Sequence, residues 1–172
     1  MYANLFPIVV LIVLLIGGGY LLAKDDIKLP FQDSDAVRVR RIANFPTVVP
    51  VIEENIEKQR RIIKSQDELN KFLNDISPES YLKVTETINF NREFVIAVSS
   101  DTHRSGGHDI KIRKIYSKPE SNKLTVSVRE RFPGKTCVTT QELNVAIDLI
   151  TIRNTDATID FERVKEVYEC ND

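Results

Sequence analysis

Apolar residues are distributed unevenly along the chain, and the longest run of them stands near its start. Leu5–Ala23 is a stretch of nineteen residues without a charge. An α-helix of that length is about 28 Å long, close to the hydrocarbon thickness of a bilayer, about 30 Å. All 24 lysines and arginines and all 25 aspartates and glutamates follow this run. The pattern predicts a membrane segment within residues 1–23 and a charged domain after it.

The membrane segment is predicted to be an uncleaved, single-pass anchor, and a cleaved signal peptide is the alternative. Gly17–Gly19 offers small residues at which a signal peptidase cuts. However, Met1–Asn4 has no lysine or arginine, and apolar residues resume at Tyr20 after the glycines. A signal peptide normally has a basic start and a shorter apolar core.

The orientation of the anchor is indicated by two opposing signals. Basic residues near a membrane segment favour the cytoplasmic side, although long domains are translocated largely regardless of such charges. The basic residues that follow the segment are Lys24, Lys28, Arg38, Arg40 and Arg41. The cysteines described below favour the opposite side, and we expect the domain to be extracytoplasmic.

Beyond the anchor, the first regular element predicted is a short strand followed by a helix. Residues 24–57 are expected to form a stalk or linker, because they are polar at first and later contain Pro46 and Pro50. Lys58–Lys64 is a strand candidate that opens the domain 58–172. Ser65 and Glu68 form a capping box that predicts a helix start. The apolar residues that follow at helical spacing, before Pro78, are Leu69, Phe72, Leu73 and Ile76.

From residue 81 onward the period of the apolar residues changes from about 3.6 to two, which is typical of strands. Phe94–Val98 is continuously apolar and is expected to be a central strand. The other predicted strands are centred on Ile110–Ile115 with a bulge near Ile115, on Leu124–Val128, on Cys137–Thr140 and on Val145–Ile152. Thr155–Tyr168 suits either a helix or a strand. The prediction is an α+β fold with a mostly antiparallel sheet and one amphipathic helix.

Charge and cysteine content narrow the function classes. The net charge of −1, with both signs interspersed, does not indicate a nucleic-acid surface. Cys137 and Cys170 are the two cysteines of the chain, and neither lies in a C-x-x-C pair. They form either one disulfide or two separate buried thiols. A disulfide requires an oxidising compartment, which is the argument for an extracytoplasmic domain.

The loop Ser99–Asp109 gathers the candidate chemistry, because it contains both histidines of the chain and a glycine pair. The histidines with Asp101 or Asp109 are a possible metal site, but the spacing fits no zinc pattern. Loops held on a rigid scaffold commonly carry recognition, so a partner-contact loop is favoured. The residues assigned to it are Asp101, His103, Arg104, Gly106, Gly107 and His108. No nucleophile elbow, Walker or dinucleotide motif is present, and we expect neither a cofactor nor catalysis.

The order of these features resembles the C-terminal domain of PrcB-type protease complex subunits, a bacterial family often found behind signal peptides or anchors. The resemblance covers about Arg60 to Ile152. The matching positions are Asn89-Phe90, Glu93, Val95–Val98, Ser105-Gly106-Gly107-His108, Ile110 and Ile112, followed by Pro133-Gly134, Val138 and Gln141. Asn89 and His108 differ from the family's aspartate and aromatic residue, and a proline is missing near Asn144.

The resemblance implies a non-catalytic accessory subunit that supports or docks a protease. The expected partners are therefore the membrane, through Leu5–Ala23, and another protein. The alternative is an envelope component similar to a type IV pilin, because an apolar N-terminal helix precedes an α+β head. The early glutamate and the basic leader of pilins are absent here.

Overall fold

The structure, a computed structural model, describes residues 37, 39–78, 82–117 and 121–170 of the chain. These residues belong to one compact unit, Asp35–Asp172. The predicted anchor Leu5–Ala23 lies outside the described residues. Within the described ranges, no helix combines the length and the apolar character that crossing a membrane requires.

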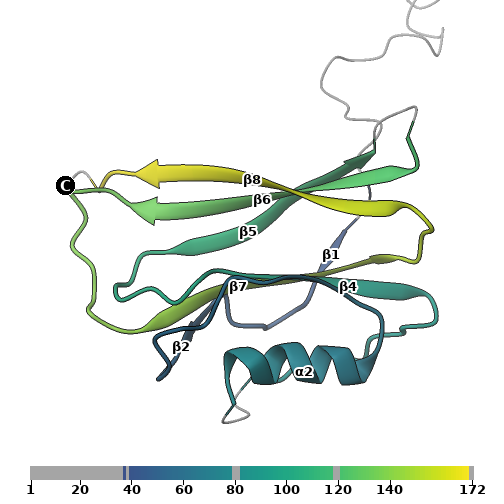
Figure 1. Cartoon of the computed structure of the whole chain (residues 1–172), viewed down its shortest axis with the longest axis horizontal. Coiled ribbons are helices and arrows are strands. Elements are labelled where there is room, and N and C mark those ends of the chain that lie inside the picture. The colour runs from purple at the N-terminus through teal and green to yellow at the C-terminus, as the bar shows by residue number, and fades with distance from the viewer. Residues whose placement is uncertain (1–36, 38, 79–81, 118–120, 171–172) are drawn as a thin grey trace, which may run out of the picture. The chain divides into compact units, whose positions relative to one another are not determined.

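The described residues form two sheets and a helix, stacked in three layers (Figure 1). The first sheet has the order β1-β7-β4-β3, with β2 also paired to β7, and the second has the order β5-β6-β8. The elements are β1 (Arg40–Arg41), β2 (Val48–Pro50), β3 (Arg60–Ile63), α2 (Gln66–Ile76), β4 (Glu93–Ser99), β5 (Asp109–Ser117), β6 (Lys123–Pro133), β7 (Asn144–Arg153) and β8 (Thr158–Tyr168). This arrangement confirms a sheet-rich α+β fold with mostly antiparallel pairing.

The first sheet is buried on both faces, because the helix covers one face and the second sheet covers the other (Figure 1). Side chains alternate between faces along a strand. Val95 and Ala97 of β4 accordingly pack with α2, whereas Phe94, Ile96 and Val98 pack toward the second sheet. Burial on both faces explains why the sequence of β4 is continuously apolar.

Helix α2 begins and ends where its local sequence predicts. Ser65 is the N-cap and its hydroxyl accepts a hydrogen bond from the Glu68 N–H at 3.2 Å. The Glu68 carboxylate accepts from the Lys64 N–H at 2.7 Å, one residue before the position expected for a capping box. The four apolar residues predicted at helical spacing are the buried residues of the helix.

The start of the domain differs from the expected boundary at residue 58. The segment expected to be a linker supplies β1 and β2, which both pair with β7. Ile42, Val49 and Ile56 of this segment are buried in the core between the first sheet and the helix. Pro50 is accommodated because β2 is only three residues long and occupies a peripheral position in the sheet.

Two strand predictions are corrected or decided by the structure. Cys137–Thr140 is not a strand but part of the loop between β6 and β7. The ambiguous segment Thr155–Tyr168 forms β8, which pairs in parallel with β6 along its whole length. Ile159 and Phe161 point toward the core at a period of two, which is why the strand is preferred there over the helix.

A buried carboxylate joins the two sheets at the edge that holds β1 and β5. The Asp148 carboxylate accepts hydrogen bonds from Arg41 Nε at 3.0 Å and from the Ile112 N–H at 2.8 Å. The register of β5 shifts between Ile112 and Lys114, as the bulge prediction requires. Asp148 thus satisfies a backbone donor at the position where the bulge interrupts the ladder.

Candidate protein-binding site

The loop Ser99–Asp109 is held to the first sheet by backbone hydrogen bonds on both sides. His103 and Asn144 exchange two backbone hydrogen bonds, at 2.8 and 2.9 Å. Asp101 Oδ1 accepts from the Lys58 N–H at 3.0 Å, and the Thr102 N–H donates to the Ile56 carbonyl at 3.0 Å. The loop is therefore a fixed surface rather than a free connection.

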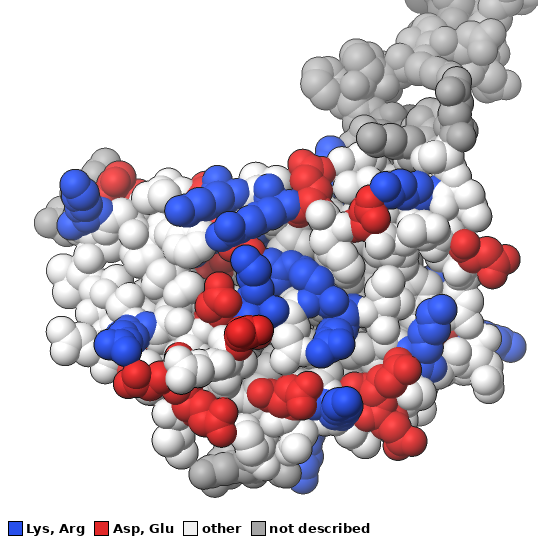
Figure 2. Space-filling view, in the orientation of Figure 1, with Lys and Arg blue, Asp and Glu red and all other residues white. Residues whose placement is uncertain are grey.

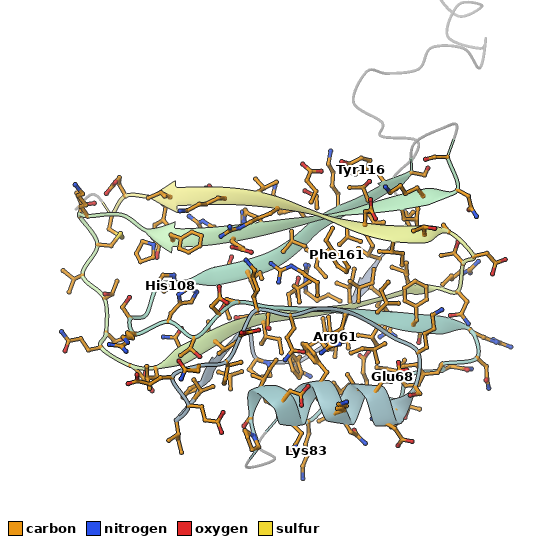
Figure 3. The ribbon with its side chains drawn as sticks, viewed as in Figure 1. Arg61, Glu68, Lys83, His108, Tyr116 and Phe161 are labelled. Carbon is orange, nitrogen blue, oxygen red and sulfur yellow. A yellow bond between two sulfur atoms is a disulfide. The ribbon has the colours of Figure 1, made fainter. Side chains whose placement is uncertain are left out.

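The two histidines of this loop stack on each other. Their ring centroids are 3.6 Å apart with an angle of 6° between the planes, and both rings meet the Phe132 ring edge to face. His108 lies toward the end of the sandwich at which β8 ends, whereas Phe161 lies between the sheets (Figure 3). The sequence predicted that the histidines belong to one site, and the structure adds Phe132 of β6 to it.

Burial controls the charge of this pair. Burial, together with a smaller contribution from the neighbouring His103, lowers the pKa of His108 to about 4. Burial also lowers the pKa of His103, although Asp101 and Glu130 act in the opposite direction. Both rings are therefore neutral at pH 7, and stacking of two imidazoles carries no charge repulsion there.

We expect the fold to lose stability as the pH falls from about 7 to 5. Because the folded-state pKa of His108 lies below its ordinary value, the unfolded chain binds the proton first and is favoured. The linkage relation gives about 2 kcal/mol over this range, reduced to about 1 kcal/mol because the ring is partly exposed to solvent. Urea unfolding at each pH measures the effect. A His103→Gln/His108→Gln variant should show a flatter profile, and an unchanged slope would contradict the assignment.

The glycine pair of the loop permits close contacts with two other segments. The Gly106 N–H donates to the Thr140 carbonyl at 2.9 Å. Gly107 has a φ of +84°, and its carbonyl accepts from the Tyr168 hydroxyl at 2.9 Å. The loop is thereby tied to the last residue of β8.

Gly107→Ala is expected to destabilise the domain by about 1–3 kcal/mol, because a side chain is strained at positive φ. Its Cβ would lie 2.9 Å from the Tyr168 hydroxyl oxygen and 3.3 Å from Pro133 Cβ. Gly106→Ala is the control, since that residue lacks the positive φ and meets the end of the Thr140 side chain. Thermal unfolding compares the two variants, and equal losses would contradict the backbone explanation.

The remaining residues assigned to the loop face outward or are occupied elsewhere. Arg104 is exposed and pairs with Glu54 at 2.9 Å. Asp101 is exposed and is already bonded to Lys58, and Asp109 accepts from Arg129 at 3.2 Å. Asp101 and Asp109 therefore have partners other than the histidines.

The stacked geometry also bears on the metal interpretation. The nitrogen lone pairs of two face-to-face imidazoles run nearly parallel and do not converge on one point. Among the residues that the structure describes, no group of three or more His, Cys, Asp or Glu side chains is placed to hold a metal ion.

An ion-pair cluster between the two sheets was not anticipated from the sequence. Glu130 of β6 is buried, and its two carboxylate oxygens bind Arg60 of β3 at 2.5 Å and Arg163 of β8 at 2.6 Å. Arg60 also donates to the carbonyls of Gln59 and Ser99. The sequence did contain a signal that Glu130 is buried. Glu130 continues the alternating row of Leu124, Val126 and Val128, whose side chains face the core.

The disulfide alternative for the two cysteines is confirmed. Cys137 and Cys170 are bonded, with a sequence separation of 33 residues. The bond fixes the residues after β8 to the loop after β6. The Gly134 N–H additionally donates to the Tyr168 carbonyl at 2.7 Å. The end of β8 is therefore held both covalently and by its backbone.

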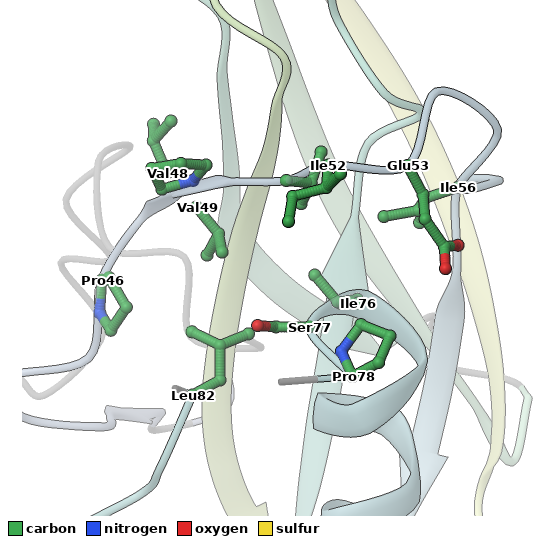
Figure 4. Close-up of a pocket in the computed structure, with 12 residues that line it drawn as sticks. Pro46, Val48, Val49, Ile52, Glu53, Ile56, Ile76, Ser77, Pro78 and Leu82 are labelled. Atoms are coloured by element: carbon green, nitrogen blue, oxygen red, sulfur yellow. The ribbon is translucent and has the colours of Figure 1, made fainter. Parts of the chain in front are cut away.

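An apolar groove of about 670 Å³ opens on the helix side of the first sheet (Figure 4). Val49 and Leu82 point toward each other across it. Its lining residues are Pro46, Val48, Val49, Pro50, Val51, Ile52, Glu53, Ile56, Ile76, Ser77, Pro78 and Leu82. Ile52 at its rim is 79% exposed, so the groove presents apolar surface to solvent.

Comparison with known protein families bears directly on this arrangement. A family model described as PrcB C-terminal matches residues 94–157. Over these residues the chain is similar to the PrcB C-terminal family. This segment begins in β4 and ends directly before β8, so it contains the contact loop, β5, β6 and β7. The resemblance expected from the sequence is confirmed over this range, which is less than half of the 172 residues. No curated protein and no solved structure matches the chain.

Proposed function

We propose that the chain is a membrane-anchored, extracytoplasmic and non-catalytic accessory domain that binds a protease and supports its complex. The observation that carries this proposal is the PrcB C-terminal segment at residues 94–157. The fixed loop Ser99–Asp109 lies within that segment and offers Arg104 to a partner.

The site chemistry favours binding over catalysis. Ser105 Oγ lies 3.3 Å from His108 Nε2, and this contact resembles a nucleophile and its base. A general base works best when its pKa is near the working pH, whereas the pKa of His108 is about 4. His108 Nδ1 also has no hydrogen-bond partner among the described atoms, so no third group orients the ring as in a triad.

Affinity capture of the tagged full chain from the membranes of its own cells tests the proposal. We expect a protease to be recovered, and we expect its abundance to fall when the chain is deleted. Arg104→Glu should reduce the recovery. Lys83→Glu is the matched control, because Lys83 is exposed near the helix, away from the loop (Figure 3). Repeated recovery of no protease, or a protease level that is unaffected by the deletion, would overturn the proposal.

The proposed location predicts how the cysteines react in intact cells. A membrane-impermeant maleimide should label Cys137 and Cys170 only after reduction, because the disulfide blocks both thiols. Labelling that needs cell lysis but no reductant would place the domain in the cytoplasm. That result would remove both the extracytoplasmic location and the function based on it.

A further inference from the structure

Strand β8 is an edge strand, and one of its sides is not paired with any strand that the structure describes. It is eleven residues long, and its neighbour in the sheet is β6. The Thr158 N–H donates to Asn122, and the Tyr168 carbonyl accepts from Gly134, so even-numbered residues direct their backbone toward β6. Backbone groups alternate in direction along a strand. The odd-numbered residues from Ile159 to Val167 therefore present their N–H and C=O groups at the free edge.

The two faces of this edge carry opposite charges. The face turned toward the first sheet carries Arg163 and Lys165, and Arg60 of β3 lies close by through its bond to Glu130. Figure 2 shows lysine and arginine side chains gathered near the middle of the face that it presents, with acidic side chains around them. The outward face of β8 instead carries Asp160, Glu162 and Glu166.

The basic row, formed by Arg163 and Lys165 of β8 with Arg60 beside them, has more positive than negative charge. Glu130 is shared between Arg60 and Arg163. The Lys165 ammonium lies 4.9 Å from the centroid of the Phe132 ring, and none of the described carboxylates forms an ion pair with it. The acidic row is better compensated, because Asp160 pairs with Lys123, Glu162 accepts from Tyr116, and Glu166 lies near two arginines.

We infer that the free edge of β8 is a docking site for an extended segment of a partner protein that adds to the sheet as a further strand. The partner segment carries acidic side chains at every second position, on the side that faces Arg163 and Lys165. A strand added at an edge gains backbone hydrogen bonds, and its alternating side chains lie about 5 Å from those of its neighbour. Charge complementarity thus selects the partner, while the backbone supplies the attachment.

The same charges disfavour pairing of β8 with a second copy of itself. In an antiparallel pair centred on Arg163, two arginines would stand opposite each other, and Asp160 would stand opposite Glu166 of the other copy. Like charges directly opposite each other destabilise a strand pair. Charged residues on an edge are a common protection against such self-association.

This inference deepens the proposed function, since it names the surface and the chemistry of the bound segment. The probe is a twelve-residue peptide with blocked ends in which glutamate and lysine alternate. The matched control peptide has the same composition in blocks of two, so that both charges fall on each side of the strand. We expect the alternating peptide to bind the full chain in detergent micelles at least about tenfold more tightly, and less tightly as salt is added.

Amide exchange measured by NMR reports where the peptide binds. The N–H groups of Arg163, Lys165 and Val167 should exchange rapidly in the free chain and slowly with the peptide, whereas those of Val164 and Glu166 should be slow in both. Slow exchange of the odd-numbered amides in the free chain would show that the edge is already covered and would overturn the inference.

Two variants separate the contribution of side-chain charge to peptide binding from that of the backbone hydrogen bonds. Lys165→Glu should weaken peptide binding at least about tenfold, whereas Lys111→Glu on β5 should change it less than about twofold. Val167→Pro removes one N–H from the free edge without touching the β6–β8 ladder, and it should also weaken binding. Equal affinity for both peptides, or binding unaffected by Lys165→Glu and Val167→Pro, would overturn the inference. So would a chain that forms dimers through β8, or one that binds anionic lipid vesicles but neither peptide.

These results are independent of the protease test. Peptide binding without capture of a protease would retain the edge site and remove the proposed function. Capture of a protease without peptide binding would support the proposed function and would mean that the protease contacts a surface other than the edge of β8.

Discussion

Glu130→Gln is expected to lower the free energy of unfolding by about 3–5 kcal/mol, the largest effect of any single substitution considered for this chain. Glu130 is 6% exposed and binds Arg60 and Arg163 at the same time. Burial lowers the pKa of Arg60, which shows that its charge is already costly to keep out of water. A neutral amide would leave that charge without its counter-ion.

Urea unfolding of the variant checks this expectation. The midpoint should shift to lower urea at an unchanged slope, and the thermal midpoint should fall by roughly 10–15 °C. Adding Arg163→Gln should restore part of the stability, because one of the two unpaired charges is then removed. A double variant less stable than Glu130→Gln alone would contradict this account.

Glu166→Gln is the matched control, because it makes the same chemical change on the same sheet. Glu166 lies 3.7 Å from Arg129 and 3.8 Å from Arg131, and its side chain is 45% exposed. Exposed ion pairs contribute about 0–1 kcal/mol. A loss as large as that of Glu130→Gln would show that burial is not the cause.

Removing the disulfide with Cys137→Ser/Cys170→Ser is expected to cost about 3–4 kcal/mol in the chain-entropy account of a loop of this length. The bond closes a loop of 33 residues that contains all of β7 and β8. Among the described strands, β8 pairs only with β6, so the covalent link restrains a strand with few other attachments.

Thermal unfolding of the double serine variant and of the reduced native chain should give similar midpoints. Amides in the C-terminal half of β8 should exchange faster in both, because that half loses its covalent attachment. A variant as stable as the oxidised chain would show that the Gly134–Tyr168 hydrogen bond and the parallel β6–β8 ladder are enough to hold β8 in place without the disulfide. The thiol-labelling experiment is unaffected by that outcome, since it depends on the bond and not on its energy.

The sequence predicted helix α2 and strand β4, because each element has a regular pattern of buried residues that can be read from its own short stretch of sequence. Helix α2 follows from the Ser65 cap and four apolar residues at helical spacing. Strand β4 follows from five consecutive apolar residues, which match its burial on both faces. In both cases, the information lies within about a dozen residues.

The features that were missed depend on contacts between distant residues. β1 and β2 are two and three residues long, so no period can be read from them, and they exist because β7 offers partners. The cluster around Glu130 joins residues 60, 130 and 163, from three separate strands. The choice between helix and strand for β8 likewise depends on the available edge of β6 rather than on its own pattern.

The central position of β7 has a consequence for the time course of folding. β1, β2 and β4 all pair with β7, which spans Asn144–Arg153. During synthesis, β1, β2 and β4 leave the ribosome before the strand that joins them. Contacts over such separations carry a large loop-closure cost and form slowly. The first sheet therefore closes only after β7 has left the ribosome, and until then β1, β2 and β4 wait for the strand that joins them.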